Sequence, residues 1–342
     1  MDGLEILPIR GMGDVTAGDD LAEMIAGAAP WLRDGDVLVV TSKIVSKSEG
    51  RLVDVPADGP ERETAREQVL ASETARVVAR RGSTAIVQTH QGYVMAAAGI
   101  DASNVDKTHL VLLPLDSDAS ARALRAALAA RGLHVAVIVS DTMGRAWRNG
   151  LTDVALGSAG IEPLRDHRGE IDPYGNELQL TEMAVVDELA GAGELVKGKC
   201  DQVPVAVVRG YPGAGRGDFR GSTTLLRDAA SDMFSLGTAE ARAAGLHDAA
   251  TLPEAGGGPE SAGSVDIAAV QRAIATVAGV TGLSTTITPE NGALSLTPGP
   301  DAGPAEWIRL GADAHRLRAA LAAEGITSTV HTRDDGVLVS LA

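Results

Sequence analysis

Cysteine, aromatic residues, long apolar runs and positive charge are all scarce in this chain of 342 residues. The single cysteine, Cys200, cannot form an intrachain disulfide, and no Cys/His spacing typical of a structural zinc site occurs. Aromatic residues make up only 2% of the chain, so the core must be built from aliphatic side chains. The sequence therefore predicts an aliphatic-core protein from a reducing compartment.

Charge and hydropathy argue against two further classes of protein. The formal net charge of −16 argues against a general nucleic-acid binder, because a phosphate backbone needs a broad basic surface. No apolar run approaches the roughly 20 residues that span a bilayer, and Met1–Ile6 lacks the basic start and apolar core of a signal peptide. We expect no nucleic-acid partner, no membrane partner and a cytoplasmic location.

The length of the chain exceeds the size at which a single core stops growing, so more than one domain is expected. Residues 251–264 are rich in glycine and proline and cannot bury an apolar face, which is typical of a flexible linker. We therefore predict a main domain over residues 1–250 and a small α+β domain over residues 265–342. In the small domain the patterns predict helices at Val265–Ala278 and Ala305–Ala323 and strands at Ser284–Thr288, Ala293–Thr297, Thr327–Thr332 and Gly336–Ser340.

Helical and strand patterns alternate along the main domain, which favours a mixed α/β architecture. The predicted strands are Leu4–Ile9, Val37–Thr41, Thr84–Gln88, Tyr93–Ala97, Leu110–Leu113, a run that ends at Ser140, and Val203–Val208. The predicted helices are Leu21–Leu32, Glu61–Arg81, Asp118–Ala130 and Leu178–Val196.

The most informative segment begins with the β-branched run Val135–Ser140, which predicts a buried strand. Asp141 follows at its carboxyl end, and Thr142, Arg145 and Arg148 come next in what we expect to be a polar loop. Open α/β sheets bind their ligands at this end, so Asp141 is a candidate metal ligand beside groups that bind phosphate or carboxylate. The alternative is that Asp141 only caps the following turn.

Three other segments carry candidate ligand-binding groups. Lys43 and Lys47 lie four residues apart after a predicted strand, so on a helical turn they would share one side, either solvated or around an anion such as a triphosphate. The chain has no P-loop motif, although Gly11–Val15 could offer backbone N–H groups to a phosphate or base. Asp101 could cap a turn, or it could join Asp141 as a paired oxygen ligand for Mg²⁺ or Mn²⁺ on nucleotide phosphates.

Several ungapped blocks together resemble the coenzyme F420-0:L-glutamate ligase family, most closely its actinobacterial members. The resemblance covers roughly residues 4–245, in order and with family-like spacing. It is carried by residues 5–11, 36–47, 96–104, 140–150, 172–177, 196–199 and 204–210.

This resemblance implies an α+β fold with an intertwined core, a homodimer, and a GTP-dependent ligase. Such an enzyme adds L-glutamate to the lactyl carboxylate of F420-0, and then further γ-linked glutamates, with the help of divalent metal, Mg²⁺ or Mn²⁺, as two ions. We expect an acyl-phosphate intermediate, with Asp141, Lys47, Arg145 and Arg148 as the catalytic groups. Guanine-nucleotide contacts are implied for Met12, Gly13, Asp14, Val15, Ser42, Lys47 and Asn104, and metal ligation for Asp101, Asp141 and Thr142.

The chain departs from the family pattern at two places. Some members carry an acidic residue where Thr142 stands, so the second metal would be held more weakly or through water here. Mycobacterial relatives carry a fused flavin-binding domain, but residues 265–342 are too few and differently patterned, so we expect no FMN and favour a stabilising or dimer-supporting appendage. The alternative functions are a non-catalytic guanine-nucleotide-binding regulator and a metal-dependent phosphatase.

Overall fold

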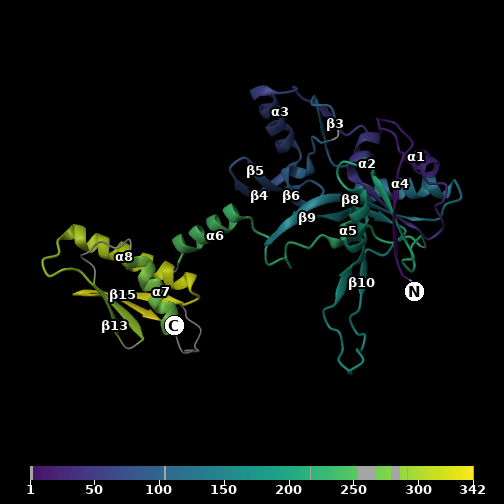
Figure 1. The fold of residues 1–342 in the computed structure, drawn as a ribbon. Coiled ribbons are helices and arrows are strands. Elements are labelled where there is room, and N and C mark those ends of the chain that lie inside the picture. Colours follow the sequence, from purple (N-terminus) through teal and green to yellow (C-terminus); the bar gives the residue numbers. More distant parts are fainter. Residues whose placement is uncertain are drawn as a thin grey trace. The chain divides into compact units, whose positions relative to one another are not determined.

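The computed structural model describes residues 3–103, 105–215, 217–252, 266–278, 286–290 and 292–341 (Figure 1). The chain divides into two compact units, Met1–Thr238 and Ala239–Ala342. Both units combine helices with β-sheets, so the mixed α+β fold is confirmed. Asn104 and nearly all of the expected linker lie outside the described residues.

A five-stranded sheet with the order β1-β12-β2-β8-β9 forms the centre of the first unit. The neighbours β2 and β8 are parallel, with Thr41 opposite Ser140, and the other neighbouring pairs are antiparallel. Its strands are β1 (Glu5–Ile9), β2 (Val37–Thr41), β8 (Ala136–Arg145), β9 (Arg148–Ala159) and β12 (Val205–Arg209).

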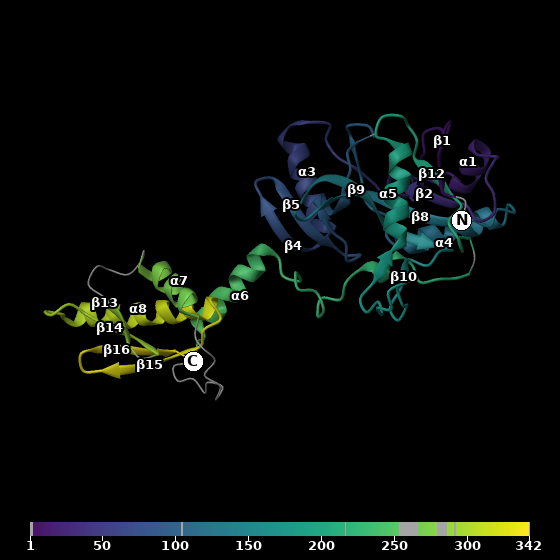
Figure 2. The same ribbon diagram turned by 60° about the horizontal axis from the view of Figure 1, so that its bottom comes forward.

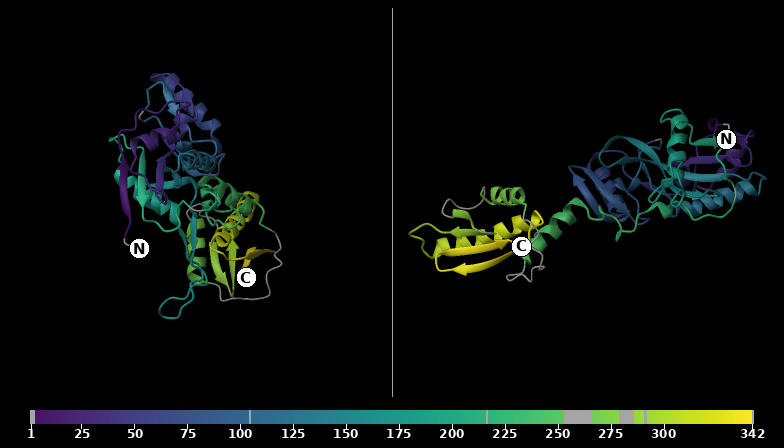
Figure 3. Two further views of the ribbon diagram at one scale, coloured as in Figure 1. Left: turned by 90° about the vertical axis from the view of Figure 1, so that its right-hand side faces the viewer. Right: turned by 90° about the horizontal axis from the view of Figure 1, so that it is seen from below.

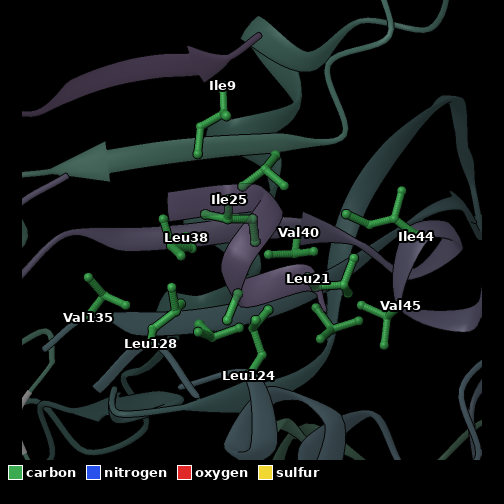
Figure 4. Close-up of a cluster of buried hydrophobic side chains, with 14 of the residues drawn as sticks. Ile9, Leu21, Ile25, Leu38, Val40, Ile44, Val45, Leu124, Leu128 and Val135 are labelled. Atoms are coloured by element: carbon green, nitrogen blue, oxygen red, sulfur yellow. The ribbon is translucent and has the colours of Figure 1, made fainter. Parts of the chain in front are cut away.

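Helices cover both faces of this sheet, as the apolar runs of β2 and β8 predict. Leu38 and Val40 point into a cluster with residues of α1 and α4 (Figure 4). Val37 and Val39 belong to a second cluster, on the opposite face, to which α5 supplies apolar partners. Figure 2 shows α5 beside the strands of the sheet. The helices of the first unit are α1 (Leu21–Ala28), α2 (Ser42–Ser48), α3 (Gly59–Ser72), α4 (Ser117–Ala129) and α5 (Val185–Lys197), with 3₁₀ turns at Ala97–Gly99 and Ser222–Leu225.

Three smaller sheets surround this core, with the orders β3-β7, β4-β5-β6 and β10-β11. The last of them forms the base of a long hairpin that projects from the rest of the unit (Figure 1). The strands of these sheets are β3 (Leu52–Asp54), β4 (Thr74–Arg81), β5 (Thr84–Thr89), β6 (Val94–Ala96), β7 (His109–Val111), β10 (Leu164–Asp166) and β11 (Glu182–Ala184).

The helix predicted over Glu61–Arg81 is wrong in its second half. Helix α3 ends at Ser72, and the chain continues as β4, which pairs with β5 through a tight turn after Arg81. Gly82 has φ +59° in this turn, a conformation that glycine adopts without strain. Pairing with β5 therefore overrides a local pattern that also fits a helix.

The polar loop predicted after Asp141 is wrong as well. Strand β8 continues through Asp141 to Arg145 and returns as β9, so this segment is a long hairpin. Polar side chains can continue a strand where it leaves the core, because the ladder of backbone hydrogen bonds does not depend on burial. The helix predicted over Leu178–Val196 also differs, since β11 comes first and α5 begins at Val185.

The second unit contains a four-stranded sheet with the order β13-β14-β16-β15. Residues of α7 and α8 share its apolar core, and α8 lies along the sheet in the right-hand view of Figure 3. No helix among the described residues is long and apolar enough to cross a membrane. The elements are α6 (Thr238–Ala250), α7 (Ile267–Ala278), β13 (Thr286–Glu290), β14 (Ala293–Thr297), α8 (Pro304–Ala323), β15 (Ser328–Arg333) and β16 (Gly336–Leu341).

Candidate functional site

The parallel pairing of β2 with β8 places Ser42 and Asp141 side by side at one edge of the central sheet. Thr41 and Ser140 are register partners, and Ser42 and Asp141 are the residues that follow them. Ser42 is buried at the first position of α2 and hydrogen-bonds the half-buried carboxylate of Asp141. The sheet topology thus brings together two groups that lie about a hundred residues apart in sequence.

Asp101 reaches the same edge by another path. Its backbone N–H donates to the carbonyl of Val111 over 3.0 Å and its carbonyl accepts in return over 2.8 Å, which fixes the loop that carries it. The Asp101 carboxylate lies 2.7 Å from Lys43 Nζ and accepts a hydrogen bond of 2.7 Å from the backbone N–H of Ser103. Because Lys43 follows Ser42 on α2, this short helix contacts both aspartates.

The electrostatics of the two carboxylates differ. The pKa of Asp141 is raised to about 6, chiefly by burial and also by the negative charges of Asp153 and Asp101, against the hydrogen bonds from Thr142 and Ser42 that lower it. Burial also opposes ionisation of Asp101, but Lys43 and Ser103 outweigh it and lower the pKa of that carboxyl. The edge therefore concentrates negative potential that a bound cation would relieve.

These donors fit one divalent ion of the magnesium type. Asp101 and Asp141 offer carboxylate oxygens, the ligands that hard cations prefer. Among the described residues no cluster of three or more histidine, cysteine, aspartate or glutamate side chains is arranged to hold a metal on its own. Two carboxylates suit an ion that completes its shell with water and phosphate oxygens, as Mg²⁺ commonly does.

Thr142 belongs to a second, neighbouring network that is already satisfied within the chain. Its hydroxyl donates to Asp153 over 2.7 Å and accepts from Lys199 Nζ over 2.7 Å. The other oxygen of Asp153 accepts from Ser140 Oγ over 2.9 Å and lies 2.7 Å from Lys197 Nζ. The hydroxyl oxygen of Thr142 and the carboxylate of Asp153 are thus each bound by a lysine ammonium group.

The candidate nucleotide-binding groups lie close to α2. Met12 and Val15 bury their side chains in the apolar core, so in this segment the exposed Gly13 and Asp14 and the backbone are the groups that can meet a ligand. The same segment runs back to α2, where the N–H of Gly18 donates to the carbonyl of Ser48 over 2.8 Å. The last turn of α2 carries the half-buried Lys47.

Arg145 and Arg148 lie farther along the β8–β9 hairpin. Both are exposed register partners at its tip. Four residues of extended strand separate Asp141 from Arg145, a distance of about 13 Å. Within one chain the structure therefore gathers Ser42, Asp101 and Asp141 at the sheet edge and holds the two arginines apart from them.

Comparison with known proteins identifies the relatives of this chain. The sequence profile described as F420-0:Gamma-glutamyl ligase matches residues 11–210, more than half of the chain. The chain belongs to the F420-0:gamma-glutamyl ligase family. It is accordingly an enzyme, a ligase, and the segment matched to the family lies wholly in the first unit.

Among the curated relatives that carry the name Coenzyme F420:L-glutamate ligase, three illustrate the extent of the match. The protein of Methanothermobacter thermautotrophicus is 38% identical over 249 residues, which is 68% of this chain and 99% of the relative. That of Methanopyrus kandleri is 40% identical over 220 residues, 60% of this chain and 87% of the relative. That of Haloarcula marismortui is 40% identical over 248 residues, 67% of this chain and 95% of the relative.

Sequence reasoning missed the roles of Asp153 and Lys197 in this ligase. Asp153 lies in β9 between the apolar positions Leu151 and Ala155, which makes it an unusual charge in a strand that enters the core. Lys197 is buried in the last turn of α5. A lone aspartate in a buried strand signals a hidden partner, although its position in the sequence could not identify Lys197 as that partner.

Proposed function

We propose that this ligase uses GTP to join the amino group of L-glutamate to the carboxylate of coenzyme F420-0, and then adds further γ-linked glutamates. The observation that carries the proposal is the meeting of Asp101 and Asp141 at the sheet edge beside α2. The names of the relatives supply the substrates, and the residues matched to the family model, 11–210, lie within the first unit.

The chemistry requires activation, because oxide is a poor leaving group from a free carboxylate. In the first step a carboxylate oxygen of F420-0 attacks the γ-phosphorus of GTP, the bond to the β-phosphate oxygen breaks, and GDP leaves. In the second step the glutamate amine attacks the acyl carbon of the acyl phosphate, phosphate leaves, and the proton of the amine passes to solvent. The chain's own part is to position these groups and stabilise charge, so no nucleophilic side chain is needed.

The residues around α2 take distinct parts in this proposal. Asp101 and Asp141 would hold a divalent ion, Mg²⁺ or Mn²⁺, which when bound neutralises charge on the phosphates. Lys47 adds fixed positive charge near the nucleotide, and Arg145 and Arg148 do so where the hairpin tip reaches an anion. The proposed nucleotide contacts are Met12, Gly13, Asp14, Val15, Ser42, Lys47 and Asn104.

We also propose that the ligase is a homodimer and carries no FMN. The projecting hairpin between β10 and β11 supports the dimer, because Tyr174 and Leu180 on it are 91% and 92% exposed. Large apolar side chains in such an arm favour burial against a second copy of the chain. A Tyr174→Ser and Leu180→Ser double variant should then run as a monomer in light scattering.

Mass spectrometry tests the proposed reaction directly. Incubation of the chain with F420-0, glutamate, GTP and Mn²⁺ should yield products that are heavier by glutamate-sized increments, with GDP and phosphate formed alongside. Omission of glutamate should abolish the heavier products. A phosphatase would instead release phosphate from GTP without glutamate, and a nucleotide-binding regulator would yield no product, so either result would refute the proposal.

A further inference from the structure

The hydroxyl of Thr142 has an ammonium group as its neighbour. Lys199 Nζ donates to Thr142 Oγ1 over 2.7 Å, while the same hydroxyl donates its own proton to Asp153 Oδ1. A divalent ion on this oxygen would have to approach Lys199 closely, and two cations at such a distance repel strongly. The site that the family resemblance assigns to a second metal is thus occupied by a positive charge of the chain.

The carboxylates near Thr142 are also engaged. Both oxygens of Asp153 have partners, since Thr142 binds one, and Ser140 and Lys197 bind the other. Glu194 contacts Lys199 and lies 3.4 Å from Lys197 Nζ. The cluster pairs two carboxylates with two ammonium groups and has no excess negative charge to attract a metal.

The Asp101 and Asp141 pair differs from this cluster in its charge balance. Lys43 is the ammonium on Asp101, whereas the partners of Asp141 are the hydroxyl of Ser42 and a backbone N–H, and Asp141 feels the charge of Asp101. The two sites lie next to each other, because Asp141 and Thr142 are consecutive in β8. One of them therefore has uncompensated negative charge and the other has none.

The two lysines of the cluster play different parts. Lys197 is buried, donates hydrogen bonds to Ser140 and Asp153, and lies 3.4 Å from a carboxylate oxygen of Glu194. The side chain of Lys199 is 61% exposed. Among the described residues it donates a hydrogen bond to Thr142 and forms an ion pair with Glu194, and an ammonium group with three N–H donors can also bind an anionic ligand.

We propose that Lys199 supplies the positive charge that a second divalent ion would otherwise provide, so that this ligase binds one divalent ion with its nucleotide. The proposal rests on the proposed function, since it places a phosphate oxygen of GTP within reach of Lys199. Glycine makes this placement possible, because Gly198 ends α5 with φ +63° and turns the chain so that Lys199 reaches Thr142. Lys199 acts as a compact point charge on the phosphate.

The number of bound ions tests the proposal without any turnover. Mn²⁺ is titrated into the full-length chain with one equivalent of a non-hydrolysable GTP analogue, and free Mn²⁺ is measured by electron paramagnetic resonance against the analogue alone. The wild-type chain should bind one ion tightly. A Thr142→Asp and Lys199→Gln double variant should bind two, with the second ion held at least about tenfold more tightly than in the wild type.

Two further variants separate charge from ligand type. Thr142→Asp alone should still bind one ion tightly, because Lys199 pairs with the new carboxylate. A Thr142→Asp and Lys199→Arg double variant should also bind one ion tightly, because it keeps the positive charge. Two ions of similar affinity on the wild type, or one ion on the double variant with an unchanged urea midpoint, would overturn the inference and leave the ligase assignment intact. If the wild type binds no manganese–nucleotide complex, the proposed function fails and this inference fails with it.

Discussion

Lys197 and Asp153 form an ion pair at 2.7 Å with both side chains almost completely buried, at 3% and 2% exposure. The pair joins the end of α5 to β9, so it connects a covering helix to the edge strand beside the candidate site. Ser140 in β8 hydrogen-bonds both partners. The network therefore positions the strand that carries Asp141.

Removal of one partner should strongly destabilise the first unit. Lys197→Met leaves the carboxylate of Asp153 buried without its counter-charge, and we expect a loss of about 3–5 kcal/mol in the free energy of unfolding. Urea denaturation followed by circular dichroism measures this loss. The Lys197→Met and Asp153→Leu double variant should recover part of it, and a single variant that costs under about 1 kcal/mol would contradict the prediction.

Two glycines of α5 provide a matched test of how closely this helix approaches the sheet. A Cβ added at Gly193 would lie 2.9 Å from Cβ of Val39 in β2, whereas at Gly191 the nearest atom, Thr152 Oγ1, would lie 3.5 Å away. Gly193→Ala should therefore destabilise the unit by about 1–3 kcal/mol through overpacking. Gly191→Ala should be neutral or stabilise it by up to about 1 kcal/mol through helix propensity. Equal urea midpoints for the two variants would show that the helix can shift.

The strongly patterned parts of the fold could be predicted from the sequence. Val37–Thr41 and Ala293–Thr297 are strands with the predicted bounds, because each is a short run with strand-forming apolar side chains that buries against helices. The prediction failed where partners distant in sequence decide the structure. Strand β4 forms because it pairs with β5, although its residues also fit a helical pattern.

The candidate site could be predicted only in part, for the same physical reason. Asp141 stands out because it follows a β-branched run, and Ser42 follows a comparable one, Val37–Thr41, whereas Asp101 follows only a short stretch rich in alanine. Lys197 and Asp153 are far apart in sequence, and only the packing of α5 on β9 brings them into contact. Local patterns predict elements, but they do not identify which buried charges become partners.

Substitution of Asp141 should separate folding from function. Asp141→Asn keeps the shape of the side chain, and because burial raises the pKa of this carboxyl to about 6, the neutral amide removes a cost of folding at pH 7. We expect an unchanged or higher free energy of unfolding, weaker binding of Mn²⁺ with a GTP analogue, and at least about a hundredfold lower turnover. Unfolding of the variant would instead show that the Asp141 carboxylate is needed for the fold.

Lys47 should act on turnover through its charge. Loss of one preorganised electrostatic contact costs about 3–4 kcal/mol of transition-state stabilisation, so Lys47→Ala should lose about a hundredfold or more in turnover. Arg80→Ala on the exposed face of β4 serves as a control that also removes one positive charge. Both rates come from the glutamate-addition assay, and wild-type turnover in Lys47→Ala would exclude this residue from the reaction.

Tyr93 should make the first unit sensitive to alkali. The pKa of its hydroxyl is raised to about 12, chiefly by burial and also by the negative charge of Asp118, and the hydroxyl donates a hydrogen bond to the carbonyl of Leu156. The folded state therefore holds the phenol proton more tightly than the unfolded chain, whose tyrosines have a pKa of about 10. The stability from this group is complete below pH 10 and is lost as the pH rises toward 12.

The loss at intermediate pH can be isolated with Tyr93→Phe, which removes the titrating group. Between pH 8 and pH 11 the wild type should lose about 1.4 kcal/mol more unfolding free energy than the variant does, since one pKa unit corresponds to that amount. At pH 8 the variant should itself be less stable by about 1 kcal/mol, because the carbonyl of Leu156 loses its donor. Urea denaturation at the two pH values gives both quantities. Parallel losses in the two proteins would mean that Tyr93 ionises as freely in the folded unit as in the unfolded chain, and that its burial does not hold the proton.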